Sequence, residues 1–413
     1  MASIAARDRC VLPGGVRMSM RQLPFHYAFR NLGRSGVRLA ASLVGSSLVV
    51  LLVLASGGFI RGMQLTLSQD AGLHENVMIL GTGSEEGVER SQIDSSVEGI
   101  AAASIAGIKQ RAGVIYASPE IHAALPIRED SASDENRVAV MRGVRPVALL
   151  VHPQVEIVDG RAPRPGRDEL MVGDLAATRL GLPDDRLALG RTVHFDDRDW
   201  TVVGHFSAPN TVMNAEIWLP LTDLQIATNR SASLSCVIVT LDDSAQADAF
   251  AEVDLFAKSR LDLEITAIRE HEYYASIAAF YGPIRFMVIV TAILIASGGI
   301  LGGLNTMYAA FAARVREVGM LQALGFTRIA IVANLTEESV FASACGALIG
   351  TLLGLLLLDG IAVRFSMGAF ALVMDAPVVL IGVAGGLLVG LVGAIPPAVR
   401  CLRLPVNEAL KSF

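Results

Sequence analysis

The sequence has few cysteines, and their positions exclude two common kinds of protein architecture. Among the 413 residues, cysteine occurs only at Cys10, Cys236, Cys345 and Cys401. No two of them form a CxxC pair, and none lies at a zinc-ligand spacing from a histidine. A zinc finger and a disulfide framework are therefore excluded.

The chain also lacks the short motifs that bind nucleotide phosphates or catalyse hydrolysis. It contains no GxxxxGK[ST], hence no P-loop, and no GxSxG. The glycine-rich segment Gly81–Gly87 lacks the GxGxxG spacing, and HEYYA at His271–Ala275 lacks the second histidine of a zinc-binding helix. We therefore expect no catalytic residue, no metal site and no cofactor bound by this chain.

Candidate metal ligands in the middle of the chain are scattered. Four histidines have no ligand spacing, which predicts surface positions or hydrogen-bonded core positions for His122, His152, His194 and His205. Three aspartates gather in an apparent hairpin turn, at Asp196, Asp197 and Asp199. We interpret them as solvated turn residues, with weak cation binding as the alternative. Basic residues alternate with acidic ones in this region, so nothing supports nucleic-acid binding.

Charge is scarce as well, and apolar residues are concentrated in four long runs. Only 18% of the residues are charged and 52% are hydrophobic, a composition typical of membrane proteins. Each run is long enough to cross the hydrocarbon core, which needs about 20 residues. We place transmembrane helices at residues 39–60, 284–304, 338–358 and 378–399. A cleaved signal peptide is the alternative for the first run, but its apolar core exceeds the usual length of about 7–15 residues.

Arginine is distributed unevenly around these runs. It is frequent in residues 1–38 and recurs in the segment 305–337 and in the tail 400–413. The positive-inside rule therefore places these three segments, and both termini, in the cytoplasm. Residues 61–283 and the short loop 359–377 then lie outside.

Residues 1–38 contain a basic segment with an apolar face. Phe25, Ala28, Phe29 and Leu32 follow the spacing of one side of a helix. This predicts an amphipathic helix along the inner membrane surface. We interpret residues 1–17 as a solvated tail, and Met18 and Met20 are alternative start positions.

Residues 61–283 have the composition of a water-exposed domain. Strand–helix–strand patterns occur at both of its ends, over 75–80, 95–108 and 113–121, and over 235–241, 245–261 and 263–268. A β-rich insert at about 138–234 lies between them. The expected fold class is an α-helical membrane protein with four transmembrane helices and a large α+β extracytoplasmic domain between the first and second.

A charged segment, ARVREVGMLQALGFTR at Ala313–Arg328, lies between the second and third apolar runs. Apolar residues recur every three positions, at Val315, Val318, Leu321 and Leu324, which predicts a short amphipathic helix. This helix would dock on a cytoplasmic partner. Alternatively, it is an interfacial connector between two transmembrane helices.

Three polar or glycine positions fit this helix. Gly325 is expected to end it, and Thr327 to cap the next helix. Arg314 and Glu317 are three residues apart, so their side chains can pair and contribute about 0.2–0.5 kcal/mol.

Small residues inside the apolar runs predict close helix packing. Gly298 and Gly302, like Gly299 and Gly303, are spaced for contact with a second helix, within one bundle or across a dimer. We interpret Glu338 as an acid at the N-terminal end of the third transmembrane helix, stabilised there by the helix dipole rather than acting as a proton relay.

The stretch from Ser297 to Ile331 resembles the signature of the FtsX/MacB-like permeases of ABC transporters. The residues that carry the resemblance are Gly298, Gly299, Gly302, Asn305, Thr306, Met307, Arg316, Glu317, Gly319, Ala323 and Gly325. It continues into the third apolar run, where the family has an acid and two small residues, with Glu338, Gly346 and Gly350. In the outer domain, VDGRAPRPGRDELMVGDLAATRLGL, LGRTVHFDDRDWTVVGHF and AEIWLPLTDLQ resemble the family's periplasmic core domain.

The resemblance implies a non-catalytic permease subunit of the bacterial inner membrane, paired with a second permease copy. Two cytoplasmic ATPase subunits would bind ATP and Mg, and no ATPase domain is expected in the chain itself. The residues expected to couple to the ATPase are Arg314, Arg316, Glu317, Gly319, Leu321, Ala323, Leu324 and Gly325. Those expected to pack the transmembrane helices are Gly298, Gly299, Gly302, Gly303, Glu338, Gly346 and Gly350.

The resemblance further implies mechanotransmission, in which ATP hydrolysis moves the outer domain. The expected function is export or extraction of a lipoprotein, peptide, lipid or amphiphilic drug, with a periplasmic adaptor and an outer-membrane channel as further partners. The alternative is a signalling permease that activates an external cell-wall hydrolase or a sensor. The large β-containing insert favours transport.

Overall fold

The computed structural model describes residues 36–66, 73–129, 135–242, 246–365 and 368–402. These residues form two compact units. The bundle unit comprises the described residues up to Leu54, Ala292–Gly354, and those from Val379 onward. The sheet unit comprises Ala55–Thr291 and Leu355–Val378. The predicted surface helix around Phe25 and the tail from residue 403 lie outside the described residues.

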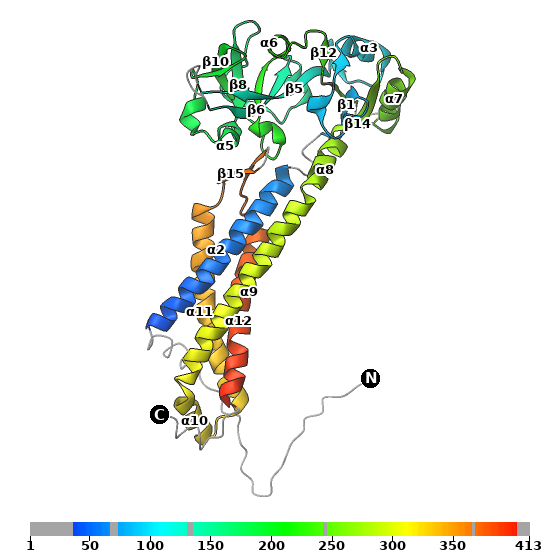
Figure 1. Cartoon of the computed structure of the whole chain (residues 1–413). Helices are drawn as coiled ribbons and strands as arrows, with labels where there is room; N and C mark the ends of the chain where they lie inside the picture. The colour runs from blue at the N-terminus through cyan, green and yellow to red at the C-terminus, as the bar shows by residue number, and fades with distance from the viewer. Residues whose placement is uncertain (1–35, 67–72, 130–134, 243–245, 366–367, 403–413) are drawn as a thin grey trace, which may run out of the picture. The chain divides into compact units, whose positions relative to one another are not determined.

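Four helices of the described chain are long and apolar enough to cross a membrane (Figure 1). They are α2 (Gly36–Thr66), α9 (Gly282–Ala312), α11 (Arg328–Leu357) and α12 (Ala376–Leu402). The expected fold class is therefore confirmed. Each helix has at least 27 residues, more than the roughly 20 that cross the hydrocarbon core. In consequence, α9 and α11 extend well into the segment that the sequence assigned to a cytoplasmic loop.

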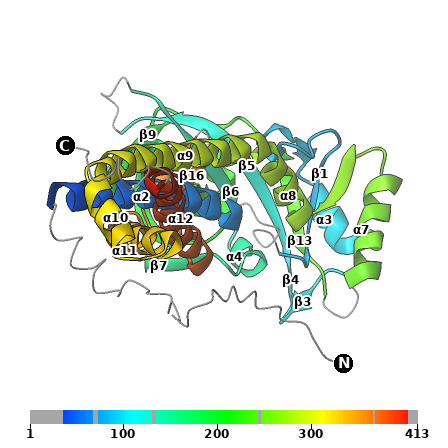
Figure 2. The same ribbon diagram turned by 90° about the horizontal axis from the view of Figure 1, so that it is seen from below.

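Glycines allow α2 to approach α11 closely in the bundle unit, where the four helices lie side by side (Figures 1 and 2). A Cβ atom on Gly350 of α11 would lie 2.6 Å from the backbone oxygen of Ser47 in α2. The Ser47 hydroxyl donates a hydrogen bond to the Gly346 carbonyl at 2.8 Å. Short contacts of this kind hold helices together in lipid, where the hydrophobic effect between helices is absent.

The first half of the sheet unit is an antiparallel sheet with the strand order β14 (Ile265–Arg269), β1 (Asn76–Gly81), β13 (Cys236–Thr240) and β5 (Ala117–Ile127). Two helices connect strands of this half, α3 (Val97–Ser104) and α7 (Gln246–Ser259). Both pack on the sheet face that carries Val77 and Ile79. This is a split β-α-β arrangement, and its two strand–helix–strand units are those read from the sequence.

The second half continues the same sheet. Its strands follow in the order β6 (Arg137–Val144), β11 (Ile217–Pro220), β8 (Glu169–Gly173), β10 (Arg198–Ser207) and β7 (Glu156–Gly160), with β9 (Thr192–Phe195) paired to β10. The long strand β5 joins the halves, because its first residues pair with β13 and its later residues pair with β6. The β-rich insert is therefore an extension of one ten-stranded sheet.

Short helices cover this second half and the opposite sheet face. They are α4 (Ala148–Val151), α5 (Ala176–Leu180), α6 (Leu221–Ala227) and α8 (Glu270–Phe280). Met78 and Leu80 alternate with Val77 and Ile79 along β1, so they point to the other face. There they pack in a second core with residues of α4 and α8.

Asp196 and Asp197 of the DDRD segment occupy the predicted hairpin turn between β9 and β10, whereas Asp199 lies in β10 opposite His194. Asp196 and Asp197 have φ angles of 51° and 52°, the left-handed values that both central residues of a type I′ turn require. The Nδ1 atom of His194 lies 2.7 Å from a carboxylate oxygen of Asp199. The first two aspartates are therefore explained by the backbone conformation of the turn, and the carboxylate of Asp199 is engaged by His194.

The sheet unit also contains the outer ends of the long helices and a hairpin. The hairpin consists of β15 (Ala362–Phe365) and β16 (Gly368–Ala371) and connects α11 to α12. Arg61 of α2 forms an ion pair with Asp375 after the hairpin. Phe59 and Tyr281, from α2 and the α8–α9 junction, both contact the ring of Phe370 edge-on. The hairpin is thus fastened to α2 and to the start of α9.

We expect Gly350→Ala to destabilise the bundle unit, because the added methyl group would collide with the backbone of α2. Overpacking of this kind costs about 1–3 kcal/mol, which lowers the midpoint of thermal unfolding of the purified protein in detergent. Gly385→Ala is the matched control, since a Cβ there meets no atom within 4 Å. Equal midpoints for the two variants would contradict this account of the packing.

Candidate coupling site

The charged segment forms a short helix, α10 (Val315–Ala323), between the end of α9 and the start of α11 (Figure 1). Val318 is buried in a small core with Met307 and Phe311 of α9 and with Ile331 of α11. Leu321 is half-buried against the same core. Two members of the predicted apolar stripe therefore point inward and fix α10 to its neighbouring helices.

The end of α10 is a Schellman motif. Gly325 has a φ of +87°, and its N–H donates to the Gln322 carbonyl at 3.0 Å. The N–H of Phe326 donates to the Leu321 carbonyl at 3.2 Å, and both side chains pack on the same core. The Thr327 hydroxyl then accepts a hydrogen bond from the N–H of Ala330 at 3.2 Å. The helix stop and the cap were both predictable from residue type.

Arg314 precedes α10 and ties it to α11. Its Nε lies 3.0 Å from a carboxylate oxygen of Glu317, the predicted i, i+3 pair. Its Nη1 lies 2.9 Å from a carboxylate oxygen of Glu338, a contact that the sequence did not predict. The Glu338 side chain is only 4% exposed, so the second contact is the stronger constraint.

Glu338 is not stabilised by the helix dipole, and that prediction was wrong. The helix α11 begins at Arg328, so Glu338 lies almost three turns inside it. A helix dipole acts within the first turn only. The charge of Glu338 is balanced by the guanidinium of Arg314 instead. The sequence misled because the transmembrane helix was predicted to begin at residue 338, whereas α11 begins at Arg328.

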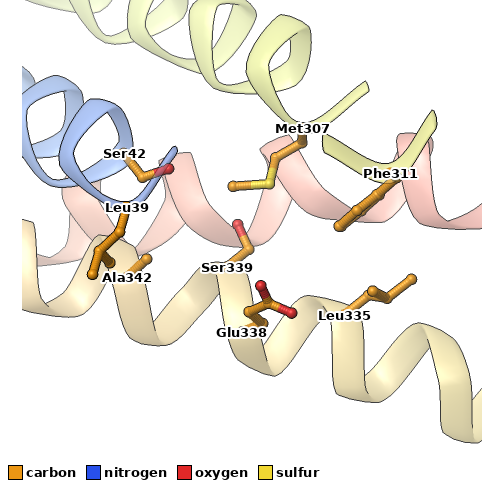
Figure 3. A pocket seen from close by; sticks show the side chains of 8 residues that line it. All are labelled: Leu39, Ser42, Met307, Phe311, Leu335, Glu338, Ser339 and Ala342. Carbon is orange, nitrogen blue, oxygen red and sulfur yellow. The ribbon is translucent and has the colours of Figure 1, made fainter. Parts of the chain in front are cut away.

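A cavity of about 10 Å³ lies beside Glu338. Figure 3 shows Met307 and Phe311 of α9 pointing toward α11, where Leu335, Glu338 and Ser339 face them. A space this small holds at most a single water molecule. This small cavity therefore offers no room for a ligand beside Glu338.

The outward side of α10 carries apolar residues. Met320 is 46% exposed and Leu324 is 64% exposed, and Ile329 at the start of α11 is also exposed. Arg316 and Ala323 are exposed as well. Arg316, Met320 and Ala323 follow the i, i+4, i+7 spacing of one helix side. This outward face, defined by Arg316, Met320, Ala323 and Leu324, is the part of the segment that is available to a partner.

The structure divides the eight predicted coupling residues into two groups. Arg316, Ala323, Leu324 and Gly325 are exposed, whereas Gly319 is buried and Leu321 is half-buried. Arg314 and Glu317 are engaged with each other. The role of all eight in coupling stays a prediction. The four apolar residues at every third position divide as well, because Val318 and Leu321 pack inward whereas Leu324 is exposed. Met320, absent from the prediction, lies on the outward face.

The predicted packing glycines also divide into two groups. A Cβ on Gly299 would collide with Val49 of α2, and one on Gly303 would touch Val389 of α12 at 3.5 Å. Gly346 and Gly350 pack on α2. A Cβ added to Gly298 or Gly302 would meet no atom of the described chain within 4 Å, so these two glycines do not pack within this bundle.

A buried polar network in the sheet unit was not predicted as a unit. Arg142 of β6 donates to both oxygens of Glu216, at 2.7 and 2.9 Å, and to Glu120 of β5 at 2.9 Å. A ring nitrogen of His152 lies 2.9 Å from the other oxygen of Glu120, and one of His122 lies 3.2 Å from the Arg142-bonded oxygen. Both histidines are thus hydrogen-bonded core residues, one of the two roles predicted for them.

The charged groups of this network, Arg142, Glu120 and Glu216, are buried away from water. Burial alone would raise the pKa of Glu120, but the charges of His152 and Arg142 outweigh burial and hold the pKa well below its usual range. Glu120, His122 and Cys236 have ligand atoms within 4.8 Å of one another. The Arg142 guanidinium beside Glu120 would repel a cation there. The sequence shows Arg142 as a charged residue within the apolar strand VAVMRGV, but it does not show which residues are its partners.

We expect Arg314→Met to destabilise the protein, because it leaves the buried Glu338 carboxylate without its guanidinium partner. Breaking a buried ion pair costs about 3–5 kcal/mol, measured here as a lower thermal unfolding midpoint in detergent. Adding Glu338→Gln to Arg314→Met should restore much of the loss. Arg316→Met, at an exposed position, is the control and should change little. A double variant no more stable than Arg314→Met would contradict the pairing.

Two family descriptions match the chain. The MacB-like periplasmic core domain matches residues 39–253, and the FtsX-like permease C-terminal region matches residues 289–406. Together they include most of α2, most of the sheet unit, most of α9, and all of α10, α11 and α12. The first match alone covers more than half of the sequence.

Individual relatives show the same likeness over shorter regions. The macrolide export ATP-binding/permease protein MacB of Campylobacter jejuni is 22% identical over 245 residues, which cover 57% of this chain and 38% of the relative. The MacB protein of Nitrobacter winogradskyi is 32% identical over 121 residues, covering 29% of this chain and 18% of the relative. The chain thus spans less than two fifths of the length of these curated relatives.

Two solved structures are similar to part of the chain. The periplasmic region of MacB from Actinobacillus actinomycetemcomitans has a TM-score of 0.37 and 12% identity, covering 49% of this chain and 92% of that one. The extracellular domain of the noncanonic ABC-type transporter YknZ from Gram-positive bacteria has a TM-score of 0.35 and 13% identity, covering 47% and 99%. On the family matches, this chain belongs to the permeases of ABC transporters that combine a MacB-like periplasmic core domain with an FtsX-like C-terminal region.

Proposed function

We propose that the chain couples ATP hydrolysis, carried out by a separate cytoplasmic ATPase, to movement of its own outer domain. Permeases of this family are components of ABC transporters, and the sequence contains no P-loop. The observation that carries the proposal is the outward face of α10. It exposes Met320 and Leu324 while Val318 and Arg314 fasten the helix from behind. An exposed apolar face on a fixed helix suits a groove on a partner.

The proposed cargo is a lipoprotein, a peptide, a lipid or an amphiphilic drug, moved outward or extracted from the membrane. Support comes from the size of the sheet unit and from the similarity to MacB proteins, whose name describes macrolide export. In this proposal the sheet unit changes position when the ATPase acts on α10, and cargo need not pass between the transmembrane helices. A periplasmic adaptor and an outer-membrane channel would complete the export path.

A second permease copy is part of the proposal. The transmembrane helix α9 is the least buried of the four within the bundle unit. Its glycines Gly298 and Gly302 leave an open strip that no described residue fills. Paired glycines four residues apart allow close contact with a helix of another subunit. Two such permeases would then present two α10 helices to two ATPase subunits.

We expect Leu324→Glu to abolish co-purification of the ATPase, because a carboxylate would be desolvated in the apolar contact. The measurement is affinity purification of the tagged protein from native membranes, followed by mass spectrometry for a P-loop protein. Leu261→Glu, at a position 84% exposed in the sheet unit, is the matched control and should retain the ATPase. Both variants should keep the wild-type unfolding midpoint.

Two results would contradict the coupling proposal. One is a wild-type protein that reproducibly purifies without any P-loop ATPase under conditions that preserve the dimer. The other is full retention of the ATPase by Leu324→Glu. Recovery of an adaptor or channel with the ATPase supports export. Recovery of a cell-wall hydrolase instead supports the signalling alternative.

The proposed orientation has both termini and α10 in the cytoplasm and the sheet unit outside. We expect a membrane-impermeant thiol reagent to label a cysteine placed at Asp197 in intact spheroplasts, because this turn residue is exposed. A cysteine placed at Gln322 in α10 should be labelled only after the membrane is opened. The four native cysteines are first replaced. The reverse labelling pattern would overturn the orientation.

A further inference from the structure

A cavity of about 150 Å³ lies within the sheet unit, where several chain segments converge. Its wall includes Thr66 at the end of α2, Tyr281 at the α8–α9 junction and Phe370 of the β15–β16 hairpin. The helices α2 and α9 are transmembrane candidates. Thr66 is the last residue of α2, and Tyr281 directly precedes α9. The cavity is therefore placed at the boundary between apolar helix and water-exposed domain.

A buried arginine without a partner lines this cavity. Arg179 of α5 is only 9% exposed. In the part of the chain that the structure describes, its guanidinium has no ion pair and no hydrogen bond, whereas Arg142 and Arg314 both have carboxylate partners. A guanidinium carries five N–H donors, and leaving them unpaired in a buried place is costly. The donors of Arg179 are thus available to a bound group.

The nearby carboxylates of the described chain form no ion pair with Arg179. Glu216 lines the cavity, but its oxygens accept hydrogen bonds from Arg142 and from Trp218. Glu89 also lines the cavity and is exposed to solvent. Burial lowers the pKa of Arg179, and the attraction of Glu216 and Glu89 does not offset it.

Other groups around the cavity suit an anion. The guanidinium of Arg364 in the hairpin is exposed and donates to the Leu180 carbonyl at 3.4 Å, and its positive charge lowers the pKa of Arg179 further. Burial raises the pKa of Tyr281, so its phenol stays protonated and can donate a hydrogen bond. The apolar part of the wall comes from Phe370 and Ile277.

We propose that this cavity binds a phosphate group through the guanidinium of Arg179. A guanidinium fork matches the spacing of two phosphate oxygens. The cavity is smaller than the roughly 300–1,000 Å³ of drug-sized sites, which suits a single headgroup rather than a macrolide. The phosphate comes either from an anionic lipid at the membrane surface or from a free phosphate in solution. This site goes beyond the proposed coupling, and its test requires no ATPase.

The test is thermal unfolding of the full chain in a non-ionic detergent and a phosphate-free buffer. Three probes are compared, namely short-chain phosphatidic acid, inorganic phosphate and a short-chain diacylglycerol, which carries no phosphate. Ligand that binds only the folded state raises the unfolding midpoint, and we expect a rise of about 2–4 °C for phosphatidic acid at saturation. Arg179→Gln should remove this rise, whereas Arg191→Gln, at an exposed arginine, should keep it.

The outcomes separate the source of the phosphate from the existence of the site. A rise with both phosphatidic acid and inorganic phosphate, lost in Arg179→Gln, supports the site and assigns it to free phosphate. A rise with phosphatidic acid alone, again lost, assigns it to lipid. A rise that persists in Arg179→Gln, an equal rise with the diacylglycerol, or no rise in the wild type would overturn the proposal.

Folding of the variants is controlled within the same experiment. Arg179→Gln removes an unpaired buried charge, so its midpoint without probe should not fall below that of the wild type. If it does fall, Arg179→Lys replaces it, and native mass spectrometry counts phosphatidic acid bound to the folded chain. Weaker binding by Arg179→Lys than by Arg191→Gln supports the site, and equal binding by the two overturns it.

Discussion

A guanidinium removed from water is costly unless it is paired with negative charge. Two arginines of this molecule meet that requirement with carboxylates, and a third does not. Arg142 satisfies it with Glu216 and Glu120, which fixes β6 to β5 and to the segment that precedes β11. Arg314 satisfies it with Glu317 and Glu338, which fixes α10 to α11. Arg179 departs from the rule, and it does so at a cavity wall. The exception is informative because the buried Arg142 and the half-buried Arg314 both follow the rule.

Much of the architecture could be read from the sequence because it depends on local patterns. Apolar runs longer than a hydrocarbon core predict transmembrane helices, and alternating or helical periodicity predicts the strands and helices at both ends of the sheet unit. Gly325 marked the end of α10 through its positive φ, and Thr327 marked the start of α11 through its capping hydroxyl. The turn at Asp196 and Asp197 could likewise be predicted from residue type, because aspartate tolerates the positive φ angles found there.

The rest depends on contacts between residues far apart in the sequence. The partner of Arg314 lies 24 residues later, and that of Arg142 lies 74 residues later, so no local pattern could assign either pair. Periodicity alone could not tell which residues of α10 point inward, because its apolar positions drift around a short helix. Packing decides this, and it turns Leu324 outward. The unpaired state of Arg179 is likewise a property of the folded chain only.

The way α10 is held bears directly on the proposed coupling. A helix that transmits force has to move together with the elements behind it, and α10 is fastened to them by three different means. Its N-terminal end is held by the ion pair of Arg314, its middle by the packing of Val318, and its C-terminal end by the packing of Phe326, which follows the Schellman turn at Gly325. Force applied to the outward face would therefore reach α9 and α11 with little loss in local bending. The helix α9 is continuous and contributes residues to both units, which is the connection that the proposed coupling of α10 to the sheet unit requires.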